Sequence, residues 1–341
     1  MKQLLNTLYL TTEECHLKLN NHGIEIEKPE GEKIRIPADS INSIVCFGNT
    51  SITTPLIGYC GEKEISLSFF SAYGKFLGRV EAPVHGSILL RQQQFHMQNQ
   101  GGERVLQLVR EILSAKLGNS RRMLIKIASG MQEHETLIRK AAEEIAAREN
   151  ALKQAADIAA MRGLEGNAAS SYFCAFAKAL NGNKYGFSFD GRQQHPAADP
   201  VNGLLSFLYT LLKNETVSAL EAVGLDPYCG FMHSLRPGKP SLALDLMEEF
   251  RSSLCDRLAL SLIHLKQITP KDFIMEHGLP RLTADARHTV LNAWQKRKRE
   301  EIQHPLLHEH IPIGLLPFAE AQLLARMIRG ETEAYTAFGW R

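Results

Sequence analysis

The sequence lacks the marks of several common classes of protein. Its 341 residues include six cysteines but no Cys-x-x-Cys pair, which argues against a zinc ribbon or a thioredoxin-like site. No Gly-x-x-x-x-Gly-Lys-Ser/Thr motif occurs, so no ATP-binding loop is predicted. No stretch reaches the ~18 apolar residues of a membrane-spanning helix. Cysteines scattered through apolar stretches are typical of buried thiols in a reducing compartment, and we expect a cytoplasmic protein without membrane contact.

Neither sign of charge is in large excess. The chain carries 39 Lys and Arg against 37 Asp and Glu, for a net charge of +2. This balance neither requires nor excludes a nucleic-acid partner, because the distribution of charge decides that question. With 44% hydrophobic and 22% charged residues, the composition is that of an ordinary globular protein. The length exceeds the size at which a single core stops growing, so we expect two domains.

The first part of the chain is predicted to be β structure. Short runs, several with alternating apolar residues, are separated by turn-forming Asn, Gly and Pro. These runs are Leu8–Leu10, Leu17–Leu19, Ile24–Glu27, Ile34–Ile36, Ile41–Phe47, Ile65–Phe69 and Phe76–Val80. A brief helix is expected around Pro55–Cys60. Many short strands with few helices indicate a small β-sandwich, which we predict for residues 1–86.

From about residue 88 onward, apolar residues recur at helical spacing. One such stripe consists of Leu106, Val109, Ile112 and Leu113. Pro200 suits a helix start, with Asp199 as the cap before it. Residues 133–160 are rich in Ala, Glu, Lys and Arg, which favours long solvent-facing helices. We therefore predict an α+β protein in which a larger all-α domain, residues 87–341, follows the small β-sandwich and carries all candidate catalytic residues.

Three segments of this predicted helical domain carry side chains that suit a divalent metal. They contribute Glu165, His233, and the pair Asp245 and Glu248. One imidazole with two or three carboxylates suits Mg²⁺ or Mn²⁺, the cations used for chemistry on phosphate. Asp245 and Glu248 lie three residues apart on a predicted helix and therefore share a face. Glu249 lies one step around the helix and is expected to face away.

Each of these residues, taken alone, has a more ordinary explanation. Glu165 can complement the dipole at a helix N-terminus, a contribution of about 0.3–1 kcal/mol. His233 is one of thirteen histidines, and a single histidine is more often a surface or core residue than a ligand. An acidic pair on a helix is usually solvated. The case for a metal site is their combination with the sequence around them.

That surrounding sequence resembles a known family. The segments are Glu165–Phe173 (EGNAASSYF), Asp199–Tyr209 (DPVNGLLSFLY), Gly224–His233 (GLDPYCGFMH), Leu242–Arg251 (LALDLMEEFR) and Lys116–Arg122 (KLGNSRR). Together with the order of a β part before a helical part, they closely resemble the CRISPR-associated integrases of spacer acquisition, the Cas1 family, over the whole chain. The opening LLNTLY and the chain length most resemble the type I-C branch.

The resemblance implies a fold and a metal site. It implies a β-sandwich and a helical catalytic domain, with a homodimer joined largely through the sandwich. It also implies one divalent ion, Mg²⁺ or Mn²⁺, held by the positions that match Glu165, His233 and Glu248. Some family members carry Asp where this chain has Glu248, and the longer side chain keeps the charge. Asp245 matches a second acidic position of the same motif and is assigned a supporting catalytic role.

The resemblance further implies a reaction and partners. The family joins a DNA 3′-hydroxyl to a phosphodiester of the CRISPR repeat and so inserts foreign fragments, or spacers, into the array. Water in place of the hydroxyl gives nuclease cleavage at the same site. The implied partners are double-stranded DNA, a Cas2 protein that bridges two dimers in a heterohexameric complex, and the Cas4 nuclease. For the C-terminal Ala337–Arg341 we expect an exposed terminus rather than a docking tail.

Basic residues near the candidates fit a role in binding DNA phosphates. They are Arg236 and Arg251, each three residues after a candidate ligand, and the adjacent Arg121 and Arg122. An ion pair with a nearby carboxylate is the alternative for Arg236 and Arg251. The run Lys296–Arg299 is interpreted as a solvated helix face rather than a DNA groove.

Two other functions stay open at the level of the sequence. One is a DNA-binding architectural subunit of the adaptation complex with no chemistry of its own. The carboxylates argue against it, because they would repel phosphate unless a cation lay between them. The other is a small-molecule metallohydrolase with a helical core, which would turn over phosphate monoesters without any nucleic acid.

Overall fold

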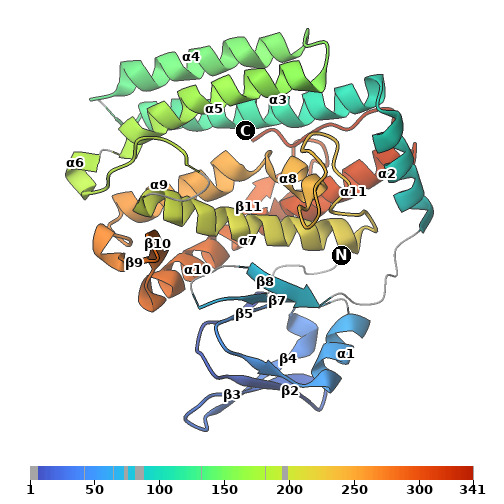
Figure 1. Ribbon diagram of the computed structural model, residues 1–341, viewed down its shortest axis with the longest axis vertical. Helices are drawn as coiled ribbons and strands as arrows, with labels where there is room; N and C mark the ends of the chain where they lie inside the picture. The colour runs from blue at the N-terminus through green and yellow to red at the C-terminus, as the bar shows by residue number, and fades with distance from the viewer. Residues whose placement is uncertain are drawn as a thin grey trace. The chain divides into compact units, whose positions relative to one another are not determined.

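The computed structural model describes residues 7–41, 43–63, 65–72, 76–80, 88–131, 133–180, 182–193 and 199–340. The chain divides into two compact units. The first consists of Met1–His85, Arg281–Glu301 and Pro312–Leu315, and the second of Gly86–Pro280, Ile302–Ile311 and Leu316–Arg341. The predicted order, an N-terminal β part followed by a helical part, is confirmed (Figure 1).

Two four-stranded sheets make up the β part of the first unit. One has the strand order β1-β5-β7-β8 and the other β4-β3-β2-β6. The strands are β1 (Thr7–Leu10), β2 (His16–Asn20), β3 (Gly23–Glu27), β4 (Lys33–Pro37), β5 (Ser43–Phe47), β6 (Ser51–Ile52), β7 (Ser66–Phe70) and β8 (Phe76–Val80). β5 pairs in parallel with β1 and β7, whereas β7 and β8 are antiparallel. In the second sheet β3 is antiparallel to β2 and β4, and β6 is parallel to β2.

The two sheets share one apolar core. Leu17 of β2, Ile24 of β3 and Ile44 of β5 are fully buried in it, because alternation along each strand points every second side chain to the same face. The helix α1 (Thr54–Glu62) adds Leu56 to this core. The brief helix predicted in this segment is therefore confirmed.

The helix α10 (Ala284–Arg299) also belongs to the first unit. Its Trp294 is buried, and Gln295 Nε2 donates to the Thr7 carbonyl at 2.8 Å, a contact between residues 288 apart in the chain. The sequence predicted that the β domain ends at residue 86, a position outside the described residues. Local sequence patterns could not assign α10 to the first unit, because that assignment depends on contacts between residues far apart in the chain.

The basic run Lys296–Arg299 at the end of α10 is solvated only in part. Lys296 and Arg299 are exposed. Lys298 is buried, and its Nζ lies 3.3 Å from Thr7 Oγ1. The interpretation of the run as a solvated face is therefore wrong for Lys298, whose ammonium contacts a hydroxyl group on β1.

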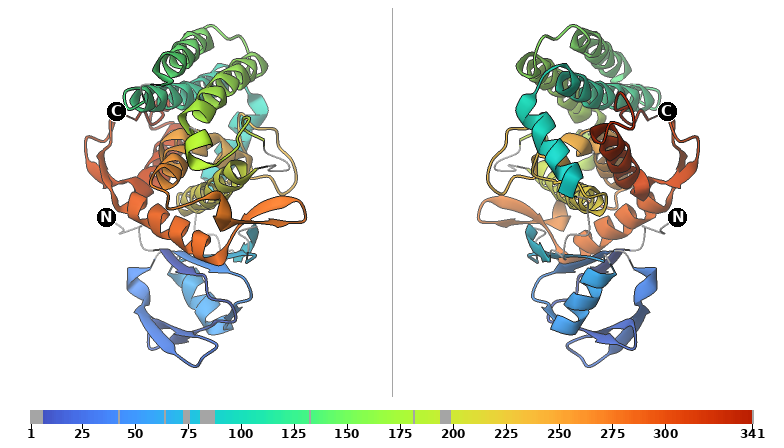
Figure 2. Two further views of the ribbon diagram at one scale, coloured as in Figure 1. Left: turned by 90° about the vertical axis from the view of Figure 1, so that its left-hand side faces the viewer. Right: turned by 90° about the vertical axis from the view of Figure 1, so that its right-hand side faces the viewer.

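Helices make up most of the second unit. They are α2 (Ile88–Gln100), α3 (Glu103–Ala128), α4 (Glu135–Leu152), α5 (Ile158–Leu180), α6 (Gly182–Tyr185), α7 (Pro200–Ala222), α8 (Ser241–Met247), α9 (Arg257–His264) and α11 (Leu316–Ile328). Figures 1 and 2 show α3, α4 and α5 alongside one another, and α7 packs against α8 and α11. The stripe predicted on α3 is fully buried at Val109 and Ile112. Asp199 caps α7 as predicted, since its Oδ1 accepts from Asn202 N at 2.9 Å.

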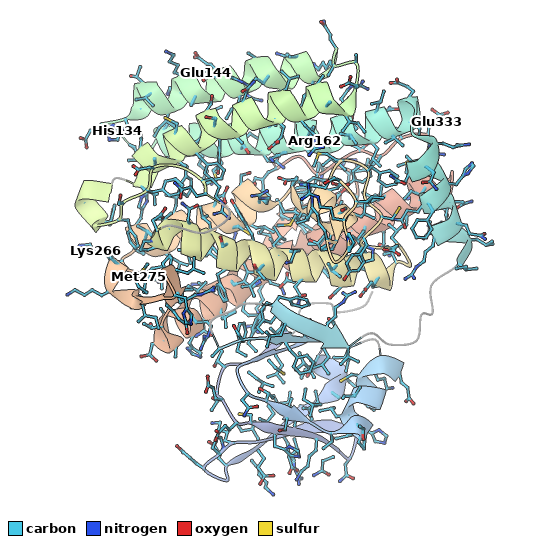
Figure 3. All side chains as sticks on the ribbon, in the orientation of Figure 1. His134, Glu144, Arg162, Lys266, Met275 and Glu333 are labelled. Carbon is cyan, nitrogen blue, oxygen red and sulfur yellow. The ribbon has the colours of Figure 1, made fainter. Side chains whose placement is uncertain are left out.

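Among the described residues, four short strands occur between α9 and α11 in the sequence. β9 (Phe273–Glu276) pairs with β10 (Leu279–Leu282), and β11 (Glu301–Gln303) pairs with β12 (His310–Pro312). Met275 on β9 is 65% exposed and projects outward in Figure 3. All six cysteines are free, and five of them are buried. Among the residues that the structure describes, no helix is long and apolar enough to cross a membrane.

The C-terminal tail is packed rather than exposed, so the expectation of an exposed terminus is wrong. Phe338 is buried, and its backbone N–H donates to Glu249 Oε2 at 2.7 Å. Trp340 N donates to Asn119 Oδ1 at 2.7 Å, while Arg341 lies outside the described residues. The tail docks because its aromatic side chains bury apolar surface and its N–H groups satisfy buried acceptors.

Candidate active site

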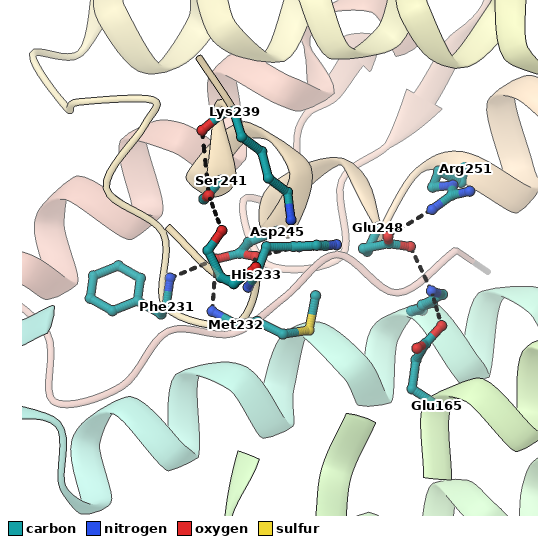
Figure 4. A network of polar contacts seen from close by, with 11 residues as sticks. Glu165, Phe231, Met232, His233, Lys239, Ser241, Asp245, Glu248 and Arg251 are labelled. Atoms are coloured by element: carbon teal, nitrogen blue, oxygen red, sulfur yellow. Dashed lines mark hydrogen bonds and ion pairs between the residues drawn. The ribbon is translucent and has the colours of Figure 1, made fainter. Parts of the chain in front are cut away.

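Two acidic side chains from distant segments meet at one lysine. Glu165 lies on α5, Glu248 directly follows α8, and Lys116 lies on α3. Lys116 Nζ is 2.5 Å from Glu165 Oε1 and 2.7 Å from Glu248 Oε2, and Figure 4 marks both ion pairs with dashed lines. The exposed fractions of the Lys116, Glu165 and Glu248 side chains are 16%, 24% and 4%. The two predicted carboxylates are therefore brought together, around a basic group to which the sequence assigned no role.

The chain leaves the regular helical path where Glu248 occurs. The helix α8 ends at Met247, a turn follows, and Arg251–Asp256 then form a π-helical turn. Turns of this kind are rare and are often found at functional sites. Asp245 and Glu248, which were predicted to share a helix face, consequently have different partners: Asp245 is fully buried against a loop, and Glu248 meets Lys116.

Asp245 organises the loop that carries His233. Its Oδ2 accepts from the backbone N–H groups of Phe231 and Met232 at 2.7 and 3.0 Å. Its Oδ1 accepts from His233 N at 2.9 Å and lies 2.7 Å from His233 Nδ1 (Figure 4). Because a carboxylate only accepts, Nδ1 carries a proton, and in the neutral form of the imidazole the lone pair is then on Nε2. Gly230 permits this packing, since a Cβ there would lie 2.8 Å from Asp245 Oδ2.

The cations around Glu248 keep its carboxyl group ionised. Arg251 Nη1 donates to Glu248 Oε1 at 2.7 Å, and the guanidinium lies 4.2 Å from the centroid of the Tyr209 ring. Burial alone would raise the pKa of this carboxyl group. The charges of Arg251 and Lys116 outweigh burial and lower the pKa to about 2. Glu248 is therefore a carboxylate at neutral pH.

The donor set suits a divalent cation, although the side chains are not already gathered around one point. Among the described residues, no three His, Cys, Asp or Glu side chains lie close enough together to hold a metal ion. The Lys116 ammonium instead lies between the two carboxylates. Glu248 Oε2 is buried, and the Lys116 ammonium lies 2.7 Å from it. This oxygen, the Glu165 carboxylate and His233 Nε2 are ligands that Mg²⁺ and Mn²⁺ accept, so the residues fit such a cation by their chemistry.

The acidic pair lines a cavity of about 680 Å³ in the second unit. Basic and aromatic side chains share its wall: Lys178, Arg192, Arg251, Phe173, Phe189 and Tyr209. Guanidinium and ammonium groups bind phosphate, and aromatic rings stack on bases. The basic part of the lining is chemically suited to phosphate groups.

A buried polar triad on the cavity wall was not predicted. Asp256 accepts from Tyr172 OH at 2.8 Å and from Tyr209 OH at 2.5 Å. Burial raises the pKa of Asp256. Both tyrosines lie in the segments that carried the family resemblance, but nothing in the sequence indicated that their hydroxyl groups share one carboxyl group.

The four arginines predicted to contact DNA have different surroundings. Arg251 lines the cavity in the ion pair described above, which is the alternative that the sequence left open for it. Arg121 Nε is 3.4 Å from Glu149 Oε2, and Arg122 donates at 3.3 Å to an asparagine of the same helix. Arg236 is exposed in the loop after the candidate histidine. Only Arg251 of the four lines the same cavity as the acidic pair.

Glu249 faces away from the cavity, as its position one step around the helix predicted. It is fully buried, and its Oε1 accepts from Tyr335 OH at 2.8 Å. The same hydroxyl lies 2.7 Å from Glu320 Oε2, and His304 Nε2 lies 2.8 Å from Glu320 Oε1. Burial and the neighbouring Glu320 raise the pKa of Glu249 well above its ordinary value. These four residues form a second buried polar cluster, to which the C-terminal tail contributes the tyrosine.

A β part followed by a helical part that carries the acidic and imidazole side chains gives the chain an α+β architecture. It belongs to the Cas1 family: the family model described as CRISPR associated protein Cas1 matches residues 8–296. The family resemblance that the sequence predicted is thereby confirmed, and curated relatives in this family are named CRISPR-associated endonucleases.

Several relatives match along the full chain. The chain is 41% identical over 345 residues to CRISPR-associated endonuclease Cas1 1 of Moorella thermoacetica, with 100% of both chains covered. It is 42% identical over 347 residues to CRISPR-associated endonuclease Cas1 1 of Chlorobaculum tepidum, again with 100% of both chains covered. A Cas4/Cas1 fusion of Geobacter sulfurreducens, named an exonuclease and endonuclease, is 32% identical over 97% of this chain and 60% of its own length.

Solved structures share the fold. A CAS1 protein from Thermotoga maritima aligns with a TM-score of 0.82 at 23% identity, over 99% of this chain and 100% of that one. A Cas6-RT-Cas1–Cas2 complex aligns with a TM-score of 0.83 at 21% identity, over 99% of this chain and 36% of that one. A casposase bound to integration product gives 0.82 at 21% identity, over 99% and 95% of the two chains. At these identities the likeness establishes the fold alone.

Proposed function

We propose that this protein is a metal-dependent DNA endonuclease and integrase that inserts foreign DNA fragments into a CRISPR array. The reaction would be the attack of a DNA 3′-hydroxyl on a phosphodiester of the repeat, with water as the nucleophile in simple cleavage. The observation that carries the proposal is the meeting of Glu165 and Glu248 around one cationic group, beside Arg251 on a cavity wall, in a chain of the Cas1 family.

Each group of the site has a part in this chemistry. Glu165, Glu248 and His233 would hold Mg²⁺ or Mn²⁺, and Asp245 would fix the imidazole so that Nε2 faces the ion. When bound, such a cation polarises a phosphoryl oxygen and lowers the pKa of the attacking hydroxyl group. The Arg251 guanidinium would bind the non-bridging oxygens of the same phosphate. No covalent intermediate on the protein is required, because the nucleophile comes from DNA or water.

The family relationship supports a set of partners. We propose double-stranded DNA as substrate and a homodimer that forms largely through the β part of the first unit. The likeness to a Cas6-RT-Cas1–Cas2 complex supports a Cas2 protein that bridges two dimers, and the Cas4/Cas1 fusion supports a Cas4 nuclease as a further partner. The N-terminal sequence and the length favour the type I-C branch.

Substitution of the proposed ligands tests the function. With the Cas2 protein of the same host and Mn²⁺, Glu165→Ala or His233→Ala should slow the joining of a 3′-hydroxyl DNA end to a repeat-bearing plasmid by roughly 100-fold or more, because a metal ligand is lost. Glu143→Ala, on an exposed position of α4, is the matched control and should join DNA at the wild-type rate. Wild-type joining by Glu165→Ala would contradict the proposal.

One observation favours the alternative of an architectural subunit without chemistry. Lys116 already neutralises part of the negative charge of the acidic pair. The repulsion between these carboxylates and DNA phosphate is therefore reduced even without a metal. Calorimetry decides between the two: the enzyme should bind Mn²⁺ in the micromolar to millimolar range, with or without DNA. An architectural subunit should bind none.

A further inference from the structure

We propose that Lys116 is a resident counter-cation that a divalent ion must displace, and that the displaced ammonium then binds a DNA phosphate. This inference rests on the proposed function, because it concerns the same metal site. Lys116 is then a positioning residue through which bound DNA raises the affinity of the site for the metal.

The contacts of Lys116 place its charge where a metal would bind. Its Nζ is within 2.7 Å of one oxygen from each of Glu165 and Glu248. These two carboxylates come from different helical segments, so the lysine joins α5 to the end of α8 through α3. Its side chain is only 16% exposed, and an ammonium between two carboxylates at this depth is weakly screened.

A divalent ion and this ammonium cannot share the same two oxygens. Mg²⁺ binds its oxygen ligands at about 2.0–2.1 Å, which would bring the ion within a few ångströms of Nζ at low dielectric. Glu248 is also paired with Arg251, so an added ion would leave the cluster with a large excess of positive charge. Displacement of the ammonium removes the closest repulsion and part of the excess charge, and we therefore expect replacement rather than addition.

The displaced ammonium can move into the cavity that Lys116 lines. Lys116 lines the same cavity as Arg192 and Arg251, and the lysine side chain has a flexible four-carbon stem. An ammonium swung into the cavity is a charged donor that faces the proposed path of the DNA backbone. A phosphate there would stabilise the displaced conformer, so DNA should tighten metal binding, and the coupling should be reciprocal.

Charge removal tests the competition directly. Lys116→Met keeps the apolar stem and removes the charge. Calorimetry on the full chain without DNA should show Mn²⁺ binding tighter than in the wild type by roughly tenfold or more, because no cation has to leave. DNA should then raise the Mn²⁺ affinity of the variant much less than that of the wild type. Lys140→Met removes a lysine from an exposed position of α4 and should leave the DNA-free Mn²⁺ affinity unchanged.

A second measurement uses the wild-type protein and does not depend on the folding of a variant. A brief pulse of an amine-acylating reagent, followed by peptide mass spectrometry, reports the accessibility of Lys116. Saturating Mn²⁺ should raise its modification several-fold and leave that of Lys178 unchanged. Glu165→Ala should abolish the response to Mn²⁺.

The possible results separate the inference from the function on which it rests. Tighter binding by Lys116→Met together with metal-induced labelling supports the inference. Equal or weaker Mn²⁺ binding by a folded Lys116→Met, or unchanged labelling at saturating Mn²⁺, overturns the inference while the metal site stands. Absence of Mn²⁺ binding in both proteins overturns the inference and the proposed function together.

Discussion

Asp245 shows how one side chain can fix a loop of the candidate site. Its two oxygens accept three backbone N–H groups and contact the imidazole of His233. The side chain is fully buried, so no water replaces these bonds if the acceptor is lost. A buried donor left unpaired costs about 1–3 kcal/mol. The conformation of the histidine loop therefore depends on this carboxylate.

Asp245→Asn is predicted to destabilise the protein and to weaken metal binding. The amide group places a donor against N–H groups, which should lower the free energy of unfolding by about 1–3 kcal/mol. The imidazole loses its fixed tautomer, which should weaken Mn²⁺ binding roughly 10- to 100-fold. Urea unfolding and calorimetry measure the two effects. Glu333→Gln, the same chemical change at an exposed position (Figure 3), should alter neither, and an Asp245→Asn protein as stable as this control would refute the argument.

The sequence identified acidic and imidazole groups but not the lysine between Glu165 and Glu248. Glu165, His233, Asp245 and Glu248 stand out because few side chains bind divalent ions. Lys116 was part of a segment that resembles the family, yet one lysine on a helix has no distinctive chemistry. Its position between the two carboxylates depends on the packing of α3 against α5 and the π-helical turn, which no local pattern reveals.

At the scale of elements, one glutamate ties together three strands of the second sheet. Glu25 on β3 lies opposite Lys18 on β2 and Arg35 on β4. Its carboxylate is 3.1 Å from Lys18 Nζ and 3.0 Å from Arg35 Nε, and it is 3% exposed. Hydrogen bonds from Asn20 and Lys18 outweigh burial and, with Arg35, lower the pKa of Glu25 to about 2.

This low pKa predicts a pH-dependent contribution to stability. The ordinary value is 4.5, so the contribution is fully present above pH 4.5 and is lost as the pH falls from there through about 2. Glu25→Gln should lower the Tm at pH 7, and the gap to the wild type should close at acidic pH. Thermal unfolding across this range measures it, with the exposed Glu30→Gln as control. A difference in Tm between the wild type and Glu25→Gln that stays constant with pH would rule out an ionised Glu25 with a lowered pKa.

The C-terminal tail is a second element whose packing has a measurable consequence. Phe338 is almost fully buried, with ring centroids 6.1 Å from Phe250 and 5.5 Å from His304. Phe338→Ala should therefore cost about 3–5 kcal/mol of unfolding free energy. Met275→Ala, at a residue 65% exposed, should change it by less than about 0.5 kcal/mol. Urea unfolding that finds the two variants equally stable would mean that the tail does not pack as described.

For the whole molecule, the order of a β part before a helical part could be predicted because it depends on local periodicity. Alternation marked strands such as β2 and β3, and the buried stripe at Val109 and Ile112 marked α3. The assignment of α10 to the first unit and the docking of the tail could not be predicted. Gln295 pairs with Thr7, and Asn119 with Trp340, across 288 and 221 residues. Such pairings depend on shape and on unsatisfied acceptors that exist only in the folded chain.

Whether Glu165, His233 and Glu248 form one divalent-cation site in the folded molecule is tested most directly by a crystal soaked in Mn²⁺. The anomalous-difference map should contain a peak bounded by the two carboxylates and the imidazole Nε2, with Lys116 turned into the cavity. Saturated crystals without a peak there, or with a peak whose ligands include neither glutamate, would contradict the site and the metal-dependent chemistry proposed for it.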